Sequence, residues 1–429
     1  MTINIPYLDR AFPLEADDKN LLAIAFPNEI DAPQSTKETI RNALASPYGR
    51  EGQGKGPPLG EFLSGGKKLL IIINDATRPT PTETILRGIL PTAAAQGYGT
   101  GSITLIVATG AHRAPTEDEY RQILGTFYGA LRPRSIHHDA RNESGMVQLG
   151  ATRNGTPILL NKHIFEADRI IVTGSVEPHY FAGFTGGRKA FLPGVAAFRT
   201  IEANHRLALS PNACSLALEG NPVHEDMMDA LGLIKAPVFS IMTVLDKEQG
   251  VAAATAGDLM ASFYGAVEIA RRIFCVQVPQ KADIVISVAK FPMDIDLYQS
   301  QKAIDNGAAA LKDGGTLILV SSCRDGIGDE GYAKLLSGSK SPQDAIEKIR
   351  GGYKLGYHKA AKMAAVSARA TVAAVTELPE ERLKSLFIES AKTPQEAVDA
   401  ALARANAKGI ALPKILILPD GCVTVPEVS

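Results

Sequence analysis

The sequence shows no excess of charge of either sign and no long apolar run. Its formal net charge is -1 and it has no stretch rich in lysine and arginine, so a nucleic-acid partner is not expected. No run of about 18 apolar residues occurs, which argues against a membrane-spanning helix. The first residues lack the basic segment and apolar stretch of a signal peptide, and we expect a cytoplasmic protein.

Cysteine is also scarce. The four residues Cys214, Cys275, Cys323 and Cys422 are scattered without paired spacing, which predicts neither a disulfide framework nor a cysteine metal site. Internal repeats and low-complexity tracts are absent. What remains is an ordinary globular composition, 45% hydrophobic and 21% charged, in 429 residues, a length that favours two domains.

Strand-like apolar runs alternate with polar loops and helical stretches along most of the chain. This order is typical of a doubly wound α/β fold. We expect a larger domain of this kind over 1–275 and a smaller α/β domain over 276–429, with the active site in the cleft between them. Residues 1 to about 65 look irregular apart from one helix over 35–45. Strands are expected over 68–73, 103–108, 134–138, 156–160, 169–173, 237–245, 282–288, 315–320 and 413–418. Helices are expected over 82–96, from about 116, over 258–274, 299–312, 329–337, 341–350, 355–368 and 393–406, and around 202–205.

The stretch Val176–Lys189 directly follows the predicted strand 169–173. It holds His179 and Lys189 ten residues apart around three glycines. Glycine lets the backbone turn sharply and approach a ligand, and open α/β sheets bind ligands where their strands end. The stretch therefore predicts a site, although an ordinary glycine-rich connection would have the same composition. It is not a nucleotide P-loop, because Arg188 separates the glycine from the lysine.

Two further polar loops follow predicted strands of the same sheet. One supplies Asp75 and Arg78 and the other supplies His112, and we expect both to converge with His179 on one crevice. Two histidines suit a general acid and a general base, because imidazole titrates close to neutral pH. A guanidinium suits a carboxylate or phosphate. Each feature also has a structural interpretation, since a lone histidine is often structural and Asp75–Pro79 could simply start a helix.

A polar segment, Tyr298–Lys302, opens a predicted helix of the second domain. Its side chains could reach across an interdomain cleft, or they could form a solvated helix end. No main role is predicted for the histidines at other positions, which are His137, His138, His163, His224 and His358.

Taken together, these motifs resemble the lactate racemase family, nickel-pincer enzymes that act on 2-hydroxy acids. The resemblance extends across both domains, and the order and spacing of five separate motifs make it specific. The motifs are Asp75–Pro79, Thr109–Arg113, Pro178–Lys189, Asn204–His205 and Tyr298–Lys302.

In that family the cofactor is a pyridinium mononucleotide whose two sulfur-bearing arms hold nickel together with a ring carbon. The resemblance implies that this nickel-pincer nucleotide forms a thioamide link to Lys189 and that His205 is the protein ligand to nickel, a metal that imidazole suits. It also implies that cofactor-synthesis enzymes mature the protein. Cofactor contacts are implied for Asp75, Ala76, Thr77, Arg78, Gly186, Gly187, Arg188 and Lys189.

The reaction implied by the resemblance inverts C2 of a 2-hydroxy carboxylic acid, with hydride transfer to and from the pincer ring. His112 and His179 resemble the acid/base pair, and Arg78, Gln299 and Lys302 resemble the substrate contacts. These residues recognise what 2-hydroxy acids share, so they do not identify lactate among them.

The family also has an aromatic residue near the pocket in its second domain. Tyr357 or His358 could stand there, and their role is left open. Two other functions use the same residues. His112, His179 and His205 could form the three-histidine site of a metal-dependent hydrolase or lyase, or the loops could belong to a non-catalytic nucleotide- or anion-binding protein.

Overall fold

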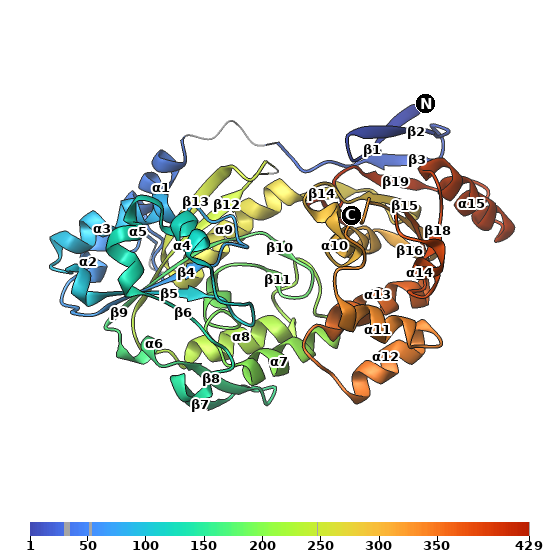
Figure 1. Cartoon of the computed structure of the whole chain (residues 1–429). Helices are drawn as coiled ribbons and strands as arrows, with labels where there is room; N and C mark the ends of the chain where they lie inside the picture. Colours follow the sequence, from blue (N-terminus) through green and yellow to red (C-terminus); the bar gives the residue numbers. More distant parts are fainter. Residues whose placement is uncertain (30–34, 51–53, 247, 429) are drawn as a thin grey trace. The chain divides into compact units, whose positions relative to one another are not determined.

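The computed structural model describes residues 1–29, 35–50, 54–246 and 248–428 (Figure 1). The chain divides into two compact units. One, here called the central unit, is Glu29–Ile273; the other, the terminal unit, combines Met1–Asn28 with Phe274–Ser429. The expected division ran 1–275 and 276–429, so the units differ from it chiefly in where the first 28 residues belong.

A six-stranded sheet forms the core of the central unit. In spatial order its strands are β13 (Val251–Asp258), β12 (Val238–Leu245), β9 (Arg169–Ser175), β4 (Leu69–Asn74), β5 (Ile103–Ala108) and β6 (Ser135–His137). All run parallel except β13, which is antiparallel to β12 at one edge. β4 is buried from Leu69 to Ile73, as expected for an apolar, β-branched run covered on both faces.

Helices of the central unit pack their apolar sides against this sheet (Figure 1). Ile85, Leu86 and Ile89 are fully buried in the core on one face. The helices are α1 (Thr36–Ala45), α2 (Leu59–Leu63), α3 (Thr82–Ala95), α4 (Glu117–Leu124), α5 (Tyr128–Leu131), α6 (His163–Glu166), α7 (Phe198–Arg206), α8 (Pro222–Gly232) and α9 (Leu259–Phe274). Thr116 and Glu119 form a capping box at the start of α4, which explains why that helix begins where its sequence predicts.

Two small antiparallel pairs lie outside the six-stranded sheet. They are β7 (Met146–Ala151) with β8 (Pro157–Asn161), and β10 (Pro178–His179) with β11 (Gly183–Phe184). The second pair folds the first part of the motif Pro178–Lys189 into a tight hairpin.

The terminal unit has its own six-stranded sheet, in which every pairing is parallel. Its strands are, in spatial order, β18 (Glu389–Ser390), β17 (Thr371–Val375), β16 (Leu311–Val320), β15 (Ala282–Val288), β19 (Ile415–Leu418) and β3 (Leu21–Ile24). Further pairs are β1 (Thr2–Tyr7) with β2 (Arg10–Glu15), and β14 (Cys275–Val278) with β20 (Val425–Val428). The helices are α10 (Leu297–Ala309), α11 (Glu330–Ser337), α12 (Pro342–Gly351), α13 (Tyr357–Arg369), α14 (Glu380–Lys384) and α15 (Pro394–Ala407).

The α/β class and the two-domain organisation are confirmed, whereas the description of the first 65 residues as irregular is wrong. β3 pairs with β19, which is why Met1–Asn28 belongs to the terminal unit. The expected strands also omit β7, β13, β17 and β20. These are short or half-exposed segments, such as the alanine-rich β13, whose composition carries little strand signal.

Candidate functional site

Three loops of the central unit carry the polar motifs, and they follow β4, β5 and β9. Because these strands are parallel neighbours, their loops leave the sheet at one edge. The loop after β5 is tied to the end of the glycine-rich motif by a hydrogen bond of 2.9 Å from the Gly110 N–H to the Gly194 carbonyl. The positive charge of Arg78, on the loop after β4, lowers the pKa of Lys189. The predicted convergence of these loops is therefore present.

Asp75 and His112 form a hydrogen-bonded pair. Nδ1 of His112 lies 2.8 Å from Oδ2 of Asp75, and the other carboxylate oxygen accepts from the backbone N–H of Thr77 at 3.0 Å. Asp75 is buried, and although burial by itself would raise its pKa, the hydrogen bonds from His112 and Thr77 leave that pKa below its ordinary value. An ionised Asp75 fixes the hydrogen of His112 on Nδ1 and leaves Nε2 as the basic nitrogen.

His179 has the opposite arrangement. Its Nδ1 accepts from the backbone N–H groups of Ala182 at 3.2 Å and Phe181 at 3.5 Å, within the β10–β11 hairpin. A neutral ring that accepts at Nδ1 carries its hydrogen on Nε2. The two histidines are thus held in different tautomers, one presenting a basic nitrogen and the other an N–H.

Lys189 lies next to His179, with its Nζ 3.1 Å from Nε2 of the histidine. Burial, followed by the positive charges of Arg78 and Arg188, lowers the pKa of Lys189 well below its ordinary value. A neutral amine can accept the Nε2–H of His179 and is a nucleophile, which an ammonium is not. The site thus contains an amine in the form that bonds to an electrophilic carbon.

The ring of Phe181 connects the residues of this site. Its centroid is 4.5 Å from that of His179, 5.0 Å from that of His205 on α7, and 5.5 Å from Nζ of Lys189. His205 is therefore near the amine and the histidine, as the motif Asn204–His205 suggested. Composition alone did not single out Phe181, because a buried phenylalanine after His-Tyr resembles any core residue.

Arg188 and the two glycines before it shape the loop. The Arg188 guanidinium is fully buried and donates to the carbonyls of Ala182 at 2.6 Å and Phe184 at 3.0 Å, and its Nε donates to Nδ1 of His224 at 3.0 Å. Both glycines have positive φ, and neither position has room for a side chain. A Cβ on Gly186 would lie 2.6 Å from the Val176 side chain, and a Cβ on Gly187 would lie 2.8 Å from the Phe263 ring. These contacts hold the turn that aims Lys189, and they offer no Arg188 atom to a ligand.

In the terminal unit, Gln299 and Lys302 lie on one face of the first turns of α10. Both are partly exposed, whereas Ser300 and Gln301 between them are fully buried. Nζ of Lys302 contacts the Met293 thioether at 3.4 Å and makes no ion pair within the described part of this unit. An ammonium without a carboxylate partner is suited to an anionic ligand.

Tyr357 and His358 begin α13, and their exposure differs. His358 is buried, and its Nδ1 lies 2.9 Å from the hydroxyl of Tyr353, whereas Tyr357 is partly exposed. This bond gives His358 a structural explanation, so Tyr357 is the one left with an available ring.

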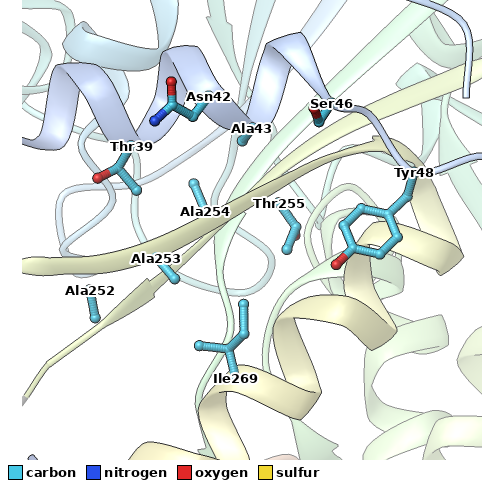
Figure 2. A pocket seen from close by; sticks show the side chains of 10 residues that line it. All are labelled: Thr39, Asn42, Ala43, Ser46, Tyr48, Ala252, Ala253, Ala254, Thr255 and Ile269. Carbon is cyan, nitrogen blue, oxygen red and sulfur yellow. The ribbon is translucent and has the colours of Figure 1, made fainter. Parts of the chain in front are cut away.

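The described residues contain no group of three or more His, Cys, Asp or Glu side chains placed to hold a metal, so a three-histidine centre is not supported. A cavity of about 370 Å³ between α1, β13 and α9, lined by small side chains with Tyr48 and Ile269, is shown in Figure 2. Another, of about 490 Å³, adjoins β6. Neither cavity includes a residue of the candidate site.

Among the helices described, none is both long and apolar enough to span a membrane.

Comparison with known proteins gives consistent matches over both units. Residues 7–215 match the lactate racemase N-terminal domain and residues 277–425 the lactate racemase C-terminal domain. The lactate racemase of Thermoanaerobacterium thermosaccharolyticum is 32% identical to this chain, over 98% of this chain and 97% of its own length. The lactate racemase of Lactiplantibacillus plantarum is 31% identical, over 98% of both chains. The solved lactate racemase apoprotein from the first organism superposes with a TM-score of 0.89 at 30% identity over both full chains. A Thermotoga maritima protein, 16% identical, shares the fold at a TM-score of 0.66, over 92% of this chain and 98% of its own.

Proposed function

Because the chain belongs to the lactate racemase family and is an isomerase, we propose that it inverts C2 of a 2-hydroxy carboxylic acid, with lactate the first substrate to test. The observation that carries this proposal is the pair of oppositely arranged histidines. His112 presents a basic nitrogen because Asp75 holds its other hydrogen, and His179 presents an N–H. Inversion needs one group that accepts the hydroxyl proton and another that returns a proton on the opposite face.

The cofactor proposed is the nickel-pincer nucleotide of the family, and the residues present fit it. Lys189 has the neutral amine that a thioamide link requires, and the imidazole of His205 lies beside the same Phe181 ring as that amine. A single histidine ligand agrees with the lack of a three-ligand group among the described residues. When bound, this group supplies a hydride acceptor and donor, which no side chain can provide.

The protein side chains then bind, orient and move protons. With a hydroxy acid in place, Nε2 of His112 takes the hydroxyl proton, and Asp75 stabilises the resulting imidazolium through the 2.8 Å contact with Nδ1. On return, Nε2 of His179 supplies the proton to the oxygen of the opposite enantiomer. His179 then takes up a proton from solvent while His112 releases the one it accepted, so that both rings return to the neutral state. In the reverse reaction the two histidines exchange roles.

Two cations are proposed to hold the substrate carboxylate. Arg78 is exposed on the loop after β4 and makes no ion pair in the portion of the chain that is described. Lys302 contacts the Met293 thioether and makes no ion pair in the described part of the terminal unit. Gln299, one turn before Lys302 on the same helix face, is proposed as a hydrogen-bonding partner of the substrate. A retained carboxylate keeps the 2-keto acid from leaving before the second proton transfer.

A non-catalytic anion-binding protein would use the same cations but has no need of the two histidine tautomers. The test compares the protein, produced with nickel and the family's cofactor-synthesis enzymes, with its His179→Gln variant. We expect the mass of the Lys189 peptide to rise by that of the pyridinium nucleotide and D-lactate to form from L-lactate, with turnover lost in the variant. Unmodified Lys189, or turnover that survives in His179→Gln, would contradict the proposal.

A further inference from the structure

A buried lysine of the terminal unit lies directly beneath the turn that carries Gln299 and Lys302. Lys359, in the first turn of α13, is 5% exposed. Its Nζ donates to the backbone carbonyl of Tyr298 and lies 3.8 Å from the centroid of the Tyr298 ring. Both contacts fall on the residue immediately before Gln299.

The contact between the two helices is reciprocal. Gln301, fully buried on α10, donates from Nε2 to the backbone carbonyl of Lys359 at 2.9 Å, while Lys359 donates back to Tyr298. We call these two hydrogen bonds the α10–α13 clasp. Each side chain reaches the backbone of the other helix, so the clasp fixes the position of one helix turn relative to the other more firmly than apolar packing, which tolerates sliding.

The other hydrogen bonds of this turn join it to residues outside α13. Asp296 caps α10 by accepting from the N–H of Gln299 at 2.7 Å, and Ser300 lies 2.7 Å from the hydroxyl of Ser321 at the end of β16. These contacts hold the start of the helix and its sheet side. Gln299 and Lys302 lie on the remaining, partly exposed face.

The buried amine is not explained by desolvation, which opposes it. Burial lowers the pKa of Lys359 to about 8, with a smaller opposing effect from the buried carboxylate of Asp305. The carbonyl of Tyr298 lies within α10, where the helix supplies it with a backbone donor, so it does not require Lys359 as a partner. The bond from Lys359 to Tyr298 therefore has its clearest effect on the turn that carries Gln299 and Lys302.

We propose that Lys359 is a positioning residue, which acts through the α10–α13 clasp to hold Gln299 and Lys302 in the geometry that binds the substrate carboxylate. The assignment of those two residues rests on the proposed function. The clasp itself does not, and it can be tested without catalysis.

The test replaces Lys359 with methionine, and Lys354→Met is the matched control. Lys354 is exposed, lies just before α13 and contributes only its backbone carbonyl to the local turn. Amide hydrogen exchange of the peptide spanning Leu297–Lys302 is measured by mass spectrometry in the full-length protein. We expect exchange to accelerate about tenfold or more in Lys359→Met and to stay unchanged in Lys354→Met, while exchange of α15 (Pro394–Ala407) in the same unit keeps its wild-type rate in both variants.

A second variant, Gln301→Leu, removes the other half of the clasp and should give the same acceleration. In the holoenzyme, both clasp variants should raise KM for the hydroxy acid about tenfold and change kcat less than about threefold, because uniform binding is lost. Unchanged exchange in both variants would overturn the proposal, even with a raised KM, since Lys359 would then act on the substrate by charge alone. If the wild type had no racemase activity, the proposed function would fail, and the exchange data would still decide whether the clasp exists.

Discussion

Nδ1 of His112 lies 2.8 Å from Oδ2 of Asp75, and this contact makes the carboxylate a partner of a histidine. The family resemblance implied that Asp75 lies in a loop contacting cofactor and substrate. Burial and the bond to Thr77 direct the carboxylate towards the next loop, so in the proposed reaction Asp75 acts through the imidazole.

Replacing Asp75 with asparagine should lower kcat by about a hundredfold or more, because the amide stabilises the His112 imidazolium far less than a carboxylate does. Pre-steady-state and steady-state racemisation rates would measure this loss. Asp118→Asn, at an almost fully exposed position, is the control and should leave kcat unchanged.

Lys189 should react with an amine-selective reagent at lower pH than the surface lysines, because its pKa is depressed by burial and by two guanidiniums. Peptide mass spectrometry of the unmatured protein would give the extent of labelling at each pH. Arg78→Met removes one of those charges and should move the labelling curve of Lys189 to higher pH by about half a unit or more. Labelling of Lys189 that follows the surface lysines would show that its amine is charged in the resting protein.

Lys302→Met should raise KM for the hydroxy acid about tenfold to a hundredfold, since a charge-assisted hydrogen bond to the carboxylate is lost. Lys334→Met is the control, because Lys334 is exposed and paired only with Glu330. Lys302→Arg should recover part of the affinity. A KM unchanged in Lys302→Met would remove this residue from the substrate site.

His224 should make the protein sensitive to acid. Burial, together with the charge of Arg188, lowers its pKa to about 3, whereas in the unfolded chain it titrates near its ordinary value of 6.5. Below pH 6.5 the unfolded state takes up a proton at His224 that the folded state does not. The contribution of His224 to the free energy of unfolding is therefore fully present above pH 6.5 and declines as the pH falls towards 3. Between pH 7 and 4 the free energy of unfolding should fall by about 3 kcal/mol through this residue.

Denaturant unfolding at several pH values would measure this decline in wild type and in His224→Gln. Glutamine can still accept from Nε of Arg188 but does not titrate, so the variant should have a flatter pH dependence of the free energy of unfolding. Equal pH dependence in both proteins would mean that other groups cause the acid sensitivity.

The clasp should also give substrate binding a dependence on alkaline pH. Lys359, with a pKa of about 8, faces Asp296, Lys302, Asp305 and Cys422, and it loses its charge before an exposed lysine does. A neutral amine donates a weaker hydrogen bond to the Tyr298 carbonyl. KM should therefore rise above pH 8 in the wild type and remain flat in Lys359→Met, which steady-state assays at fixed ionic strength would show.

The sequence predicted the parts of the fold that have a strong local signal. The apolar β4 and the capped α4 are where their residues place them, and the loops after β4, β5 and β9 meet because parallel strands bring them to one edge. The edge strands β3 and β13 were missed. Their pairing depends on partners distant in the chain, and four to eight half-buried residues do not reveal such partners.

The sequence pointed to polar residues that the structure brings together, but not to their contacts. Arg188 was expected to contact the cofactor, and in the structure it is buried and donates to His224 and to the carbonyls of Ala182, Phe184 and Gly186. His224 had no predicted role because its partner is 36 positions away along the chain. Phe181 and Lys359 were not singled out either, since a phenylalanine and a lysine reveal their importance only through what surrounds them.

The pairing of β3 with β19 has a consequence for how the protein is made. Leu21–Ile24 is synthesised well before its partner Ile415–Leu418, with the whole central unit between them. β3 therefore has no partner strand until β19 has been made, and the central unit can fold in between. A fragment starting at residue 274 would have a permanently open edge at β19, so self-association is its expected fate unless Met1–Asn28 is supplied as a separate peptide.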